Sequence, residues 1–167
     1  TWLREGYADI AVCAHPPSRK GAVSEFNTEK LYDNRLVVTA RKGHPKAQAR
    51  SLADLLDCEW LLHGPSEGPG SLYASVFRAH GLKPPTPRVI SDSFISTLSL
   101  LERSDAMSLL PEMLIQHYED AGRLIHLRLN EDMPHWDVSL ITRTQTPLTP
   151  MAQKMVEAFR RTRAVKI

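Results

Sequence analysis

Residues 31–56 constrain the fold more than any other part of this sequence. They read LYDNRLVVTARKGHPKAQARSLADLL, in which the apolar and β-branched run Leu36–Thr39 predicts a short strand. A basic turn follows, and Pro45 disfavours helical geometry for the histidine before it. Ser51 and Asp54 then give the serine-x-x-acid pattern that begins a helix. A strand joined in this way to a capped helix favours an α/β architecture.

Strands and helices alternate along the rest of the chain. Nearly continuous apolar runs are typical of strands that are covered on both faces, as in parallel sheets. Such runs occur at Asp9–Ala14, Glu59–His63, Arg88–Ser91, Ala106–Leu110, Leu124–Leu129 and Val138–Thr142. Helices are predicted for Leu52–Cys58, for Ser71–His80, from a cap at Asp92 or Ser93 to Arg103, for Glu112–Ala121 and after Thr149-Pro150. This alternation predicts an α/β fold with mainly parallel sheets.

The final helix has a candidate packing face. Met151, Met155, Val156 and Phe159 recur at helical spacing and are predicted to share that face. Methionines at such spacing are interpreted as core residues and not as a sulfur site.

Charge and length exclude some classes of function. With 167 residues the chain is one domain, or two small lobes that share a core. Lys and Arg number 21 against 19 Asp and Glu, so the net charge is only +2. A free-standing nucleic-acid binder would normally carry a basic stripe. The one dense basic run, Arg160 to Arg163, closes a helix, where cations complement the helix dipole, so direct DNA binding by this segment is not expected.

The remaining composition points to a reduced, intracellular protein without a cofactor. Cys13 and Cys58 are too far apart in sequence for a metal-type or redox C-x-x-C spacing. The seven histidines show no paired metal-ligand spacing, and no phosphate-binding glycine motif occurs. No apolar run approaches a membrane span and no signal peptide opens the chain. Because Thr1 is not a methionine, we expect a processed product or a fragment.

Four landmarks occur along the chain in a characteristic order. They are L-x-x-G-x-x-D-I-A-V at Leu3–Val12, the His-Pro turn with S-L-A-D-L, S-L-L-P at Ser108–Pro111, and L-T-P-x-A at Leu148–Ala152. In this order and spacing the sequence resembles the effector-binding domain of a LysR-type transcriptional regulator over essentially its whole length. Where that family usually has a glycine pair before S-L-L-P, this chain has Ser104-Asp105, and both residues tolerate a turn.

The resemblance implies a two-lobed fold like that of periplasmic binding proteins. Lobe one would comprise 1–43 and 135–167, and lobe two 44–134. A small effector would bind between the lobes. The family's first strand and helix of lobe one, and its DNA-binding winged helix-turn-helix, are expected to lie outside this chain, so lobe one is expected to be incomplete.

The family also implies partners. It implies a homodimer or homotetramer in the cytoplasm, contact with DNA only through the winged helix-turn-helix, no membrane association, no cofactor and no catalytic activity.

The resemblance places the effector site at three segments. These are the end of the strand after D-I-A-V, the turn after the first strand of lobe two, and the start of the next capped helix. The matching residues are Cys13, Ala14, His15, Gly64, Pro65, Ser66, Ser93, Phe94 and Ile95. Glycine turns and helix N-termini favour anions, while the aromatic and aliphatic side chains can contact a carbon skeleton. We therefore expect a small organic acid, aromatic acids included. Gly64 and Pro65 could also simply form a turn, Ser93 could be only a helix cap, and His15 could be a surface histidine.

Two other functions compete with a sensor. GPSEG matches the G-x-S-x-G nucleophile elbow, with Ser66 as nucleophile, Asp105 as acid and His117 or His126 as base. Pro65 before the serine, and the Pro-Gly pair that interrupts the next helix, count against hydrolysis. A solute-binding protein of transport would share the two-lobed fold, and the His-Pro crossover favours the regulator.

Overall fold

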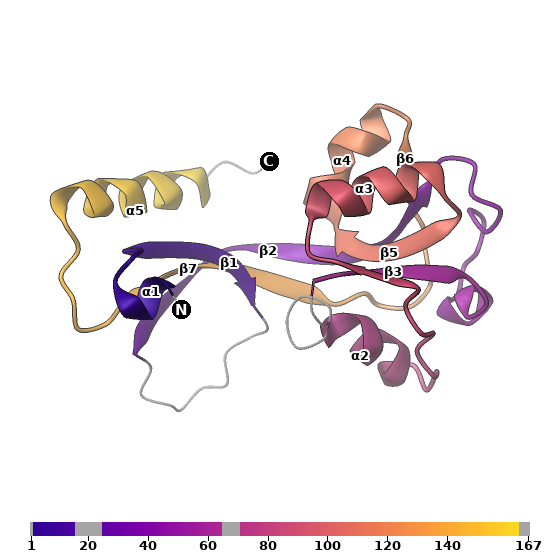
Figure 1. Cartoon of the computed structure of the whole chain (residues 1–167), viewed down its shortest axis with the longest axis horizontal. Coiled ribbons are helices and arrows are strands. Elements are labelled where there is room, and N and C mark those ends of the chain that lie inside the picture. Colours follow the sequence, from indigo (N-terminus) through magenta and orange to yellow (C-terminus); the bar gives the residue numbers. More distant parts are fainter. Residues whose placement is uncertain (1, 16–24, 65–70, 164–167) are drawn as a thin grey trace. The chain divides into compact units, whose positions relative to one another are not determined.

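The computed structural model describes residues 2–15, 25–64 and 71–163, which divide into two compact units. The first unit comprises residues 1–34 and 136–167, and the second comprises residues 35–135. Strand β2 (Phe26–Arg41) leads from the first unit into the second, and the chain returns at the start of β7 (His135–Arg143). Figure 1 shows the helices and strands in chain order. No helix in the described part of the chain is long and apolar enough to cross a bilayer.

The first unit is a three-stranded sheet with a helix packed on it. It contains α1 (Trp2–Glu5), β1 (Ile10–His15), the first part of β2, most of β7, and α5 (Pro150–Arg163). The strand order is β1-β7-β2, and β1 pairs antiparallel with β7. Thr149 caps α5, because its hydroxyl oxygen accepts from the Ala152 N–H at 3.2 Å, and Pro150 opens the helix.

The prediction for the buried face of α5 is wrong for its two methionines. Val156 and Ala152 are buried, and Val156 packs with Leu31 and Leu140 of the sheet. Met151 is 71% exposed and Met155 is 50% exposed, so they lie beside the packing face and not on it. Ala152 takes the place of the long side chains because a small residue lets the helix lie close to the sheet.

The second unit has a mixed sheet with helices on both faces. Its remaining elements are η1 (Leu52–Leu55), β3 (Glu59–His63), α2 (Ser71–Ala79), β4 (Val89–Ser91), α3 (Phe94–Arg103), β5 (Ala106–Pro111), α4 (Glu112–Asp120) and β6 (Leu124–His126). The strand order is β2-β5-β3-β4, with β6 also paired to β2. The predicted α/β fold is confirmed. β3 is parallel to β4 and β5, whereas β2 joins β5 and β6 antiparallel.

Two predicted elements are shorter than expected. The helix predicted for Leu52–Cys58 is a single 3₁₀ turn over Leu52–Leu55, and the strand predicted for Leu124–Leu129 ends at His126. The predicted start at Ser51 is confirmed: its hydroxyl oxygen accepts from the Ala53 N–H at 3.1 Å, and the Asp54 carboxylate accepts from the Ser51 N–H at 3.2 Å. Both leucines of the turn are fully buried, so the turn serves to place them in the core.

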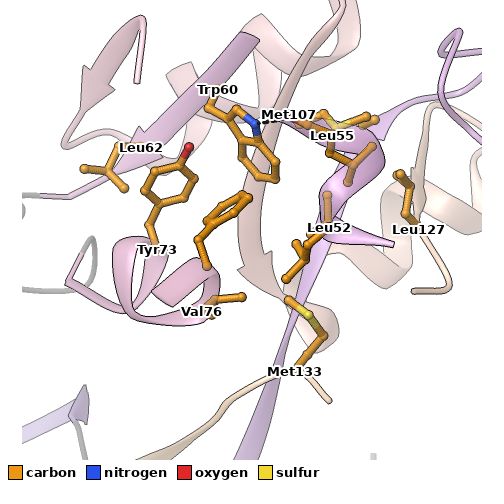
Figure 2. Packing of buried hydrophobic residues seen from close by; sticks show 12 residues of the cluster. Leu52, Leu55, Trp60, Leu62, Tyr73, Val76, Met107, Leu127 and Met133 are labelled. Carbon is orange, nitrogen blue, oxygen red and sulfur yellow. Dashed lines mark hydrogen bonds between the residues drawn. The ribbon is translucent and has the colours of Figure 1, made fainter. Parts of the chain in front are cut away.

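An aromatic cluster forms the core on the α2 face of this sheet (Figure 2). The rings of Trp60, Tyr73 and Phe77 have centroids 5.2–5.3 Å apart in tilted and edge-on arrangements, which aromatic pairs prefer. The polar atoms of two of these rings are satisfied: the indole N–H of Trp60 donates to the Leu55 carbonyl at 3.1 Å, and the Tyr73 hydroxyl donates to the Pro85 carbonyl at 3.0 Å. The opposite face packs against α3 and α4 through a second cluster that includes Leu98, Leu101 and Ile115.

The His-Pro turn has a structural role in this unit. His44 is buried, and its Nδ1 accepts from the Lys46 N–H at 2.9 Å. Its Nε2 therefore carries the proton and donates to the Asp105 carbonyl, also at 2.9 Å. The Asp105 carboxylate in turn binds the Arg41 guanidinium at 2.6–2.7 Å. These bonds connect the His-Pro turn to the bend at Ser104-Asp105, which lies immediately before β5.

The bend before β5 needs no glycine. Ser104 has extended backbone geometry, and in the described part of the chain only glycines have positive φ. The Ser104 hydroxyl donates to the Leu100 carbonyl at 2.8 Å and accepts from the Ala106 N–H at 3.3 Å. A serine-aspartate pair therefore replaces a glycine pair here without backbone strain.

We predict that Phe77→Ala lowers the free energy of unfolding by about 3–5 kcal/mol, because it leaves a cavity beside two aromatic rings. Equilibrium urea unfolding measures the loss. Leu114→Ala, at a half-exposed site on α4, is the matched control and should change stability by less than about 1 kcal/mol. Equal losses in the two variants would contradict the placement of Phe77 in the core.

We also predict that His44→Ala lowers the free energy of unfolding by about 2–4 kcal/mol, since it leaves the Lys46 N–H and the Asp105 carbonyl without partners. The exposed His80 supplies the control variant, His80→Ala, for which a change of no more than about 0.5 kcal/mol is expected. Urea unfolding at pH 7.5 compares the two. A His44 variant as stable as the control would rule out this hydrogen-bonded role.

Candidate functional site

The carboxyl ends of β3 and β4 meet at one edge of the second unit's sheet. His63 lies opposite Ser91 in the parallel ladder, and the next residue, Gly64, donates its N–H to the Ser91 carbonyl at 2.9 Å. Gly64 has φ +78°, a left-handed conformation that suits glycine because a side chain would be strained there. The backbone therefore turns sharply after β3, at the edge where open α/β sheets bind ligands.

The N-terminus of α3 lies at the same edge. Ser93 caps the helix: its hydroxyl oxygen accepts from the Ser96 N–H at 3.3 Å, and its carbonyl accepts the first helical bond from Thr97 at 2.9 Å. The N–H groups of Phe94 and Ile95 have no partner within the helix, as expected for a first turn. They give this end of α3 a partial positive charge, which favours an anion.

A second serine fixes the direction in which the chain enters α3. The Ser91 hydroxyl donates to the Ser93 carbonyl at 3.1 Å and accepts from the Ser93 N–H at 3.3 Å. This reciprocal pair joins the last residue of β4 to the cap of α3. The helix terminus is thus held against the strand ends before any ligand arrives.

His63 connects the strand end to the helix. Its ring lies edge-on to Phe94, with centroids 5.4 Å apart, and its Nδ1 is 3.4 Å from the hydroxyl oxygen of Thr97. Thr97 is fully buried and donates its hydroxyl hydrogen to the Ser93 carbonyl at 3.0 Å. Burial lowers the pKa of His63, and this effect outweighs the opposing influence of the Asp92 carboxylate and of a hydrogen bond to the Ser91 backbone. A neutral, half-buried imidazole therefore stands beside a helix N-terminus.

The first turn of α3 also offers apolar surface. Phe94 is half-buried between His63 and the core, whereas Ile95 is 75% exposed. An exposed isoleucine beside unpaired N–H groups can contact the carbon skeleton of a ligand whose charged group faces the helix. The arrangement suits recognition, since it combines hydrogen-bond donors, a titratable ring and an apolar contact.

The structure brings some of the predicted site residues together in the second unit, and others belong to the first unit. Gly64, Ser93, Phe94 and Ile95 lie at this one edge. Pro65 and Ser66 lie outside the described residues. Cys13, Ala14 and His15 end β1 in the other unit, opposite Ser139, Val138 and Asp137 of β7, and the Cys13 thiol is exposed and free.

Sequence reasoning missed His63 and Thr97. The sequence indicates His63 only as the end of a strand, although it directly precedes the predicted turn glycine. Thr97 stands one helical turn after Ser93, a spacing at which a hydroxyl can reach back to the cap carbonyl. These two positions could have been found from the capped helix and the strand end.

The residues proposed for a hydrolase have other partners. The Asp105 carboxylate binds Arg41, and the His126 ring binds Glu119 at 2.7 Å. Two of the three acid and base candidates, Asp105 and His126, thus have other partners. Among the described residues, no group of three or more histidine, cysteine or acidic side chains could hold a metal ion.

Known proteins share this sequence pattern and fold. Residues 1–164 match the family described as the LysR substrate binding domain. The HTH-type transcriptional regulator GbpR of Azospirillum brasilense is 23% identical over 161 residues, a match that covers 95% of this chain and 46% of GbpR. The chain thus spans less than half the length of that relative.

Two solved structures show the same fold. The CcmR regulatory domain of Synechocystis PCC6803, solved in complex with 2-PG, superposes with a TM-score of 0.81 at 17% identity and covers 99% of this chain and 78% of that one. The effector binding domain of QuiR, solved in complex with shikimate, gives a TM-score of 0.78 at 17% identity, covering 98% of this chain and 75% of that one. Because the family match extends over nearly the whole sequence, the chain belongs to the LysR substrate binding domain family, the effector-binding part of LysR-type transcriptional regulators.

Proposed function

We propose that this chain senses a small organic acid at the edge formed by His63, Gly64 and the N-terminus of α3. The observation that carries the proposal is the capped start of α3, which is held against the strand ends beside the half-buried His63. A carboxylate placed there would accept hydrogen bonds from the free N–H groups of the first turn and gain from the helix dipole.

The carbon skeleton of the ligand would lie over Phe94 and Ile95. Their apolar surface, of which Ile95 supplies the exposed part, favours an organic acid over a bare inorganic anion. The QuiR domain of the same fold was solved with shikimate, itself an organic acid, which supports this ligand class for the proposal.

Several residues of the site stay predictions. Cys13, Ala14 and His15 of the first unit, together with Pro65 and Ser66, are proposed to contact the same ligand on the basis of the family resemblance.

The lobes implied by that resemblance, 1–43 with 135–167 and 44–134, are supported by the division into two compact units, although the boundary between these units lies within β2.

We propose that the ligand acts by population shift and not by catalysis. A ligand that binds one arrangement of the regulator more tightly shifts the equilibrium towards that arrangement. The response would pass to the DNA through a winged helix-turn-helix of the regulator, in a cytoplasmic homodimer or homotetramer. The relative GbpR is named as an HTH-type transcriptional regulator, which supports this role, and the nearly balanced charge of the chain is consistent with contact to DNA through another domain.

We predict that one chemical class of small carboxylates raises the midpoint of thermal unfolding by about 5–10 °C at 100 times its dissociation constant, since binding at that concentration adds about 2.7 kcal/mol. A panel of aliphatic and aromatic carboxylates, scanned by thermal unfolding, measures the shift. Ile95→Asp places a carboxylate at the helix N-terminus and should abolish it, and because this side chain is exposed the variant should fold normally.

Leu100→Asp is the matched control for the ligand panel. Leu100 also lies on α3 and is partly exposed, but it stands beyond the first turn of the helix. Its thermal shift should equal that of the unmodified chain. Equal shifts in the Ile95 and Leu100 variants would place the ligand elsewhere, and a panel without any active compound would contradict the assignment to small carboxylates.

We predict that affinity for the active carboxylate falls as the pH rises. Burial lowers the pKa of His63 in the free protein, whereas a bound anion would raise it, so binding takes up a proton. Asp92 is the charged described residue that acts on His63, and it is present in both states. Affinity is then highest below the pKa of His63 in the free protein and falls as the pH rises through the pKa of the complex, by up to about tenfold in all for each pKa unit that the ligand adds.

Calorimetric titration between pH 5.5 and pH 8.0 measures this dependence. His63→Asn should flatten the profile, because asparagine does not titrate. His80→Asn, at an exposed position, should leave the profile unchanged. A His63 variant with the same slope as the unmodified chain would exclude His63 as the source of the proton uptake.

A further inference from the structure

A hollow lies on the other side of β5 from the candidate effector edge. It has a volume of about 360 Å³ and is formed entirely by residues of the second unit, which include Arg35, Val37, His126, Leu127, Arg128 and Met133. In the strand order β3 and β2 are separated by β5. With strands about 4.8 Å apart, β2 is roughly 10 Å from β3, so this hollow and the α3 terminus are different places.

Two arginines at the rim of this hollow have no carboxylate partner. The side chains of Arg35 and Arg128 make no ion pair with any described residue, and both are exposed. Elsewhere in the same unit the arginines at 41, 88 and 123 each bind an acidic side chain. Two unpaired guanidinium groups that line one hollow form a concentrated positive charge.

The backbone around the hollow is held in place from both sides. The Leu127 N–H donates to the Val38 carbonyl at 2.8 Å, and the Leu36 N–H donates to the Pro134 carbonyl at 2.9 Å. The Arg128 carbonyl accepts from the Arg50 guanidinium at 3.2 Å. The main-chain positions of Arg35 and Arg128 are therefore fixed, and a ligand would need to order only their side chains.

Buried apolar side chains and the ring of His126 form the rest of the hollow. Leu127 and Met133 are nearly fully buried and belong to the core on the α2 face of the sheet, so they form an apolar base over which charge–charge attraction is stronger than in bulk water. The Glu119 carboxylate accepts from both the backbone N–H and the ring Nδ1 of His126 at 2.7 Å. This pair orients the ring, and its carboxylate offsets part of the positive charge of the hollow.

We propose that this hollow binds a small oxoanion, a carboxylate or a phosphate, between the guanidinium groups of Arg35 and Arg128. Each planar guanidinium can donate two parallel hydrogen bonds to such a group. The net charge of the groups that line the hollow stays positive after Glu119 is counted, because two arginines face one carboxylate. This site does not depend on the effector site proposed at α3.

Calorimetric titration of the whole chain with inorganic phosphate, at constant ionic strength, tests the site. Acetate is titrated separately so that phosphate and carboxylate binding are distinguished. Arg35→Gln and Arg128→Gln should each weaken binding of the preferred anion by about tenfold, since each removes charge-assisted hydrogen bonds. Arg161→Gln, which removes an exposed arginine from α5, is the matched control and should bind as the unmodified chain does.

Ile95→Asp separates this proposal from the effector site. It should leave phosphate or acetate binding at the hollow unchanged, even though it abolishes carboxylate binding at α3. Affinities that are equal in the Arg35, Arg128 and Arg161 variants would overturn the proposal, as would the absence of binding of both anions at millimolar concentration. Binding that is lost in Ile95→Asp and kept in both arginine variants would assign the anion to α3 instead.

Discussion

Strand β3 is the element on which the rest of the second unit depends. Parallel ladders hold both of its edges, through β4 on one side and β5 on the other. Trp60 packs into the aromatic cluster on one face, and Leu61 packs into the second core on the opposite face. A strand fixed in all four directions cannot shift its register without exposing one of these side chains. The position of His63 at its end is therefore set by the core and not by the loop that follows.

The sequence predicted the elements of this fold better than their contacts. The sequence predicts the capping box at Ser51 and a cap at Asp92 or Ser93, because the bonds that define such caps join residues only two or three positions apart. The contact of His63 with Thr97 joins residues 34 positions apart, and no local pattern predicts such a pair. Tertiary packing also overruled the helical periodicity of α5, where Ala152 is buried and Met151 is exposed. Local signals are thus sufficient for caps and turns, whereas a site built from several strands requires the fold.

Ser104 and Asp105 have a structural role at the bend before β5. A glycine pair at this bend would supply flexibility but no side chain. Here Ser104 bonds to the end of α3, while Asp105 accepts from His44 through its carbonyl and binds Arg41 through its carboxylate. Three segments of the second unit meet at these two residues. The bend is stabilised by specific polar contacts, so its sequence and that of the His-Pro turn are physically coupled.

The division into units has a consequence for the order of folding. Residues 35–135 are contiguous, whereas the first unit joins two segments that the whole second unit separates in sequence. Its central strand β7 must insert between β1 and β2, so this sheet forms only after the ribosome has released the C-terminal part of the chain. Closing so long a loop in an unfolded chain carries a large entropic cost, and prior folding of the second unit reduces it by bringing the ends of that loop together. Vectorial synthesis therefore favours a pathway in which the second unit, with the edge at α3, is assembled first and the first unit's sheet is completed last.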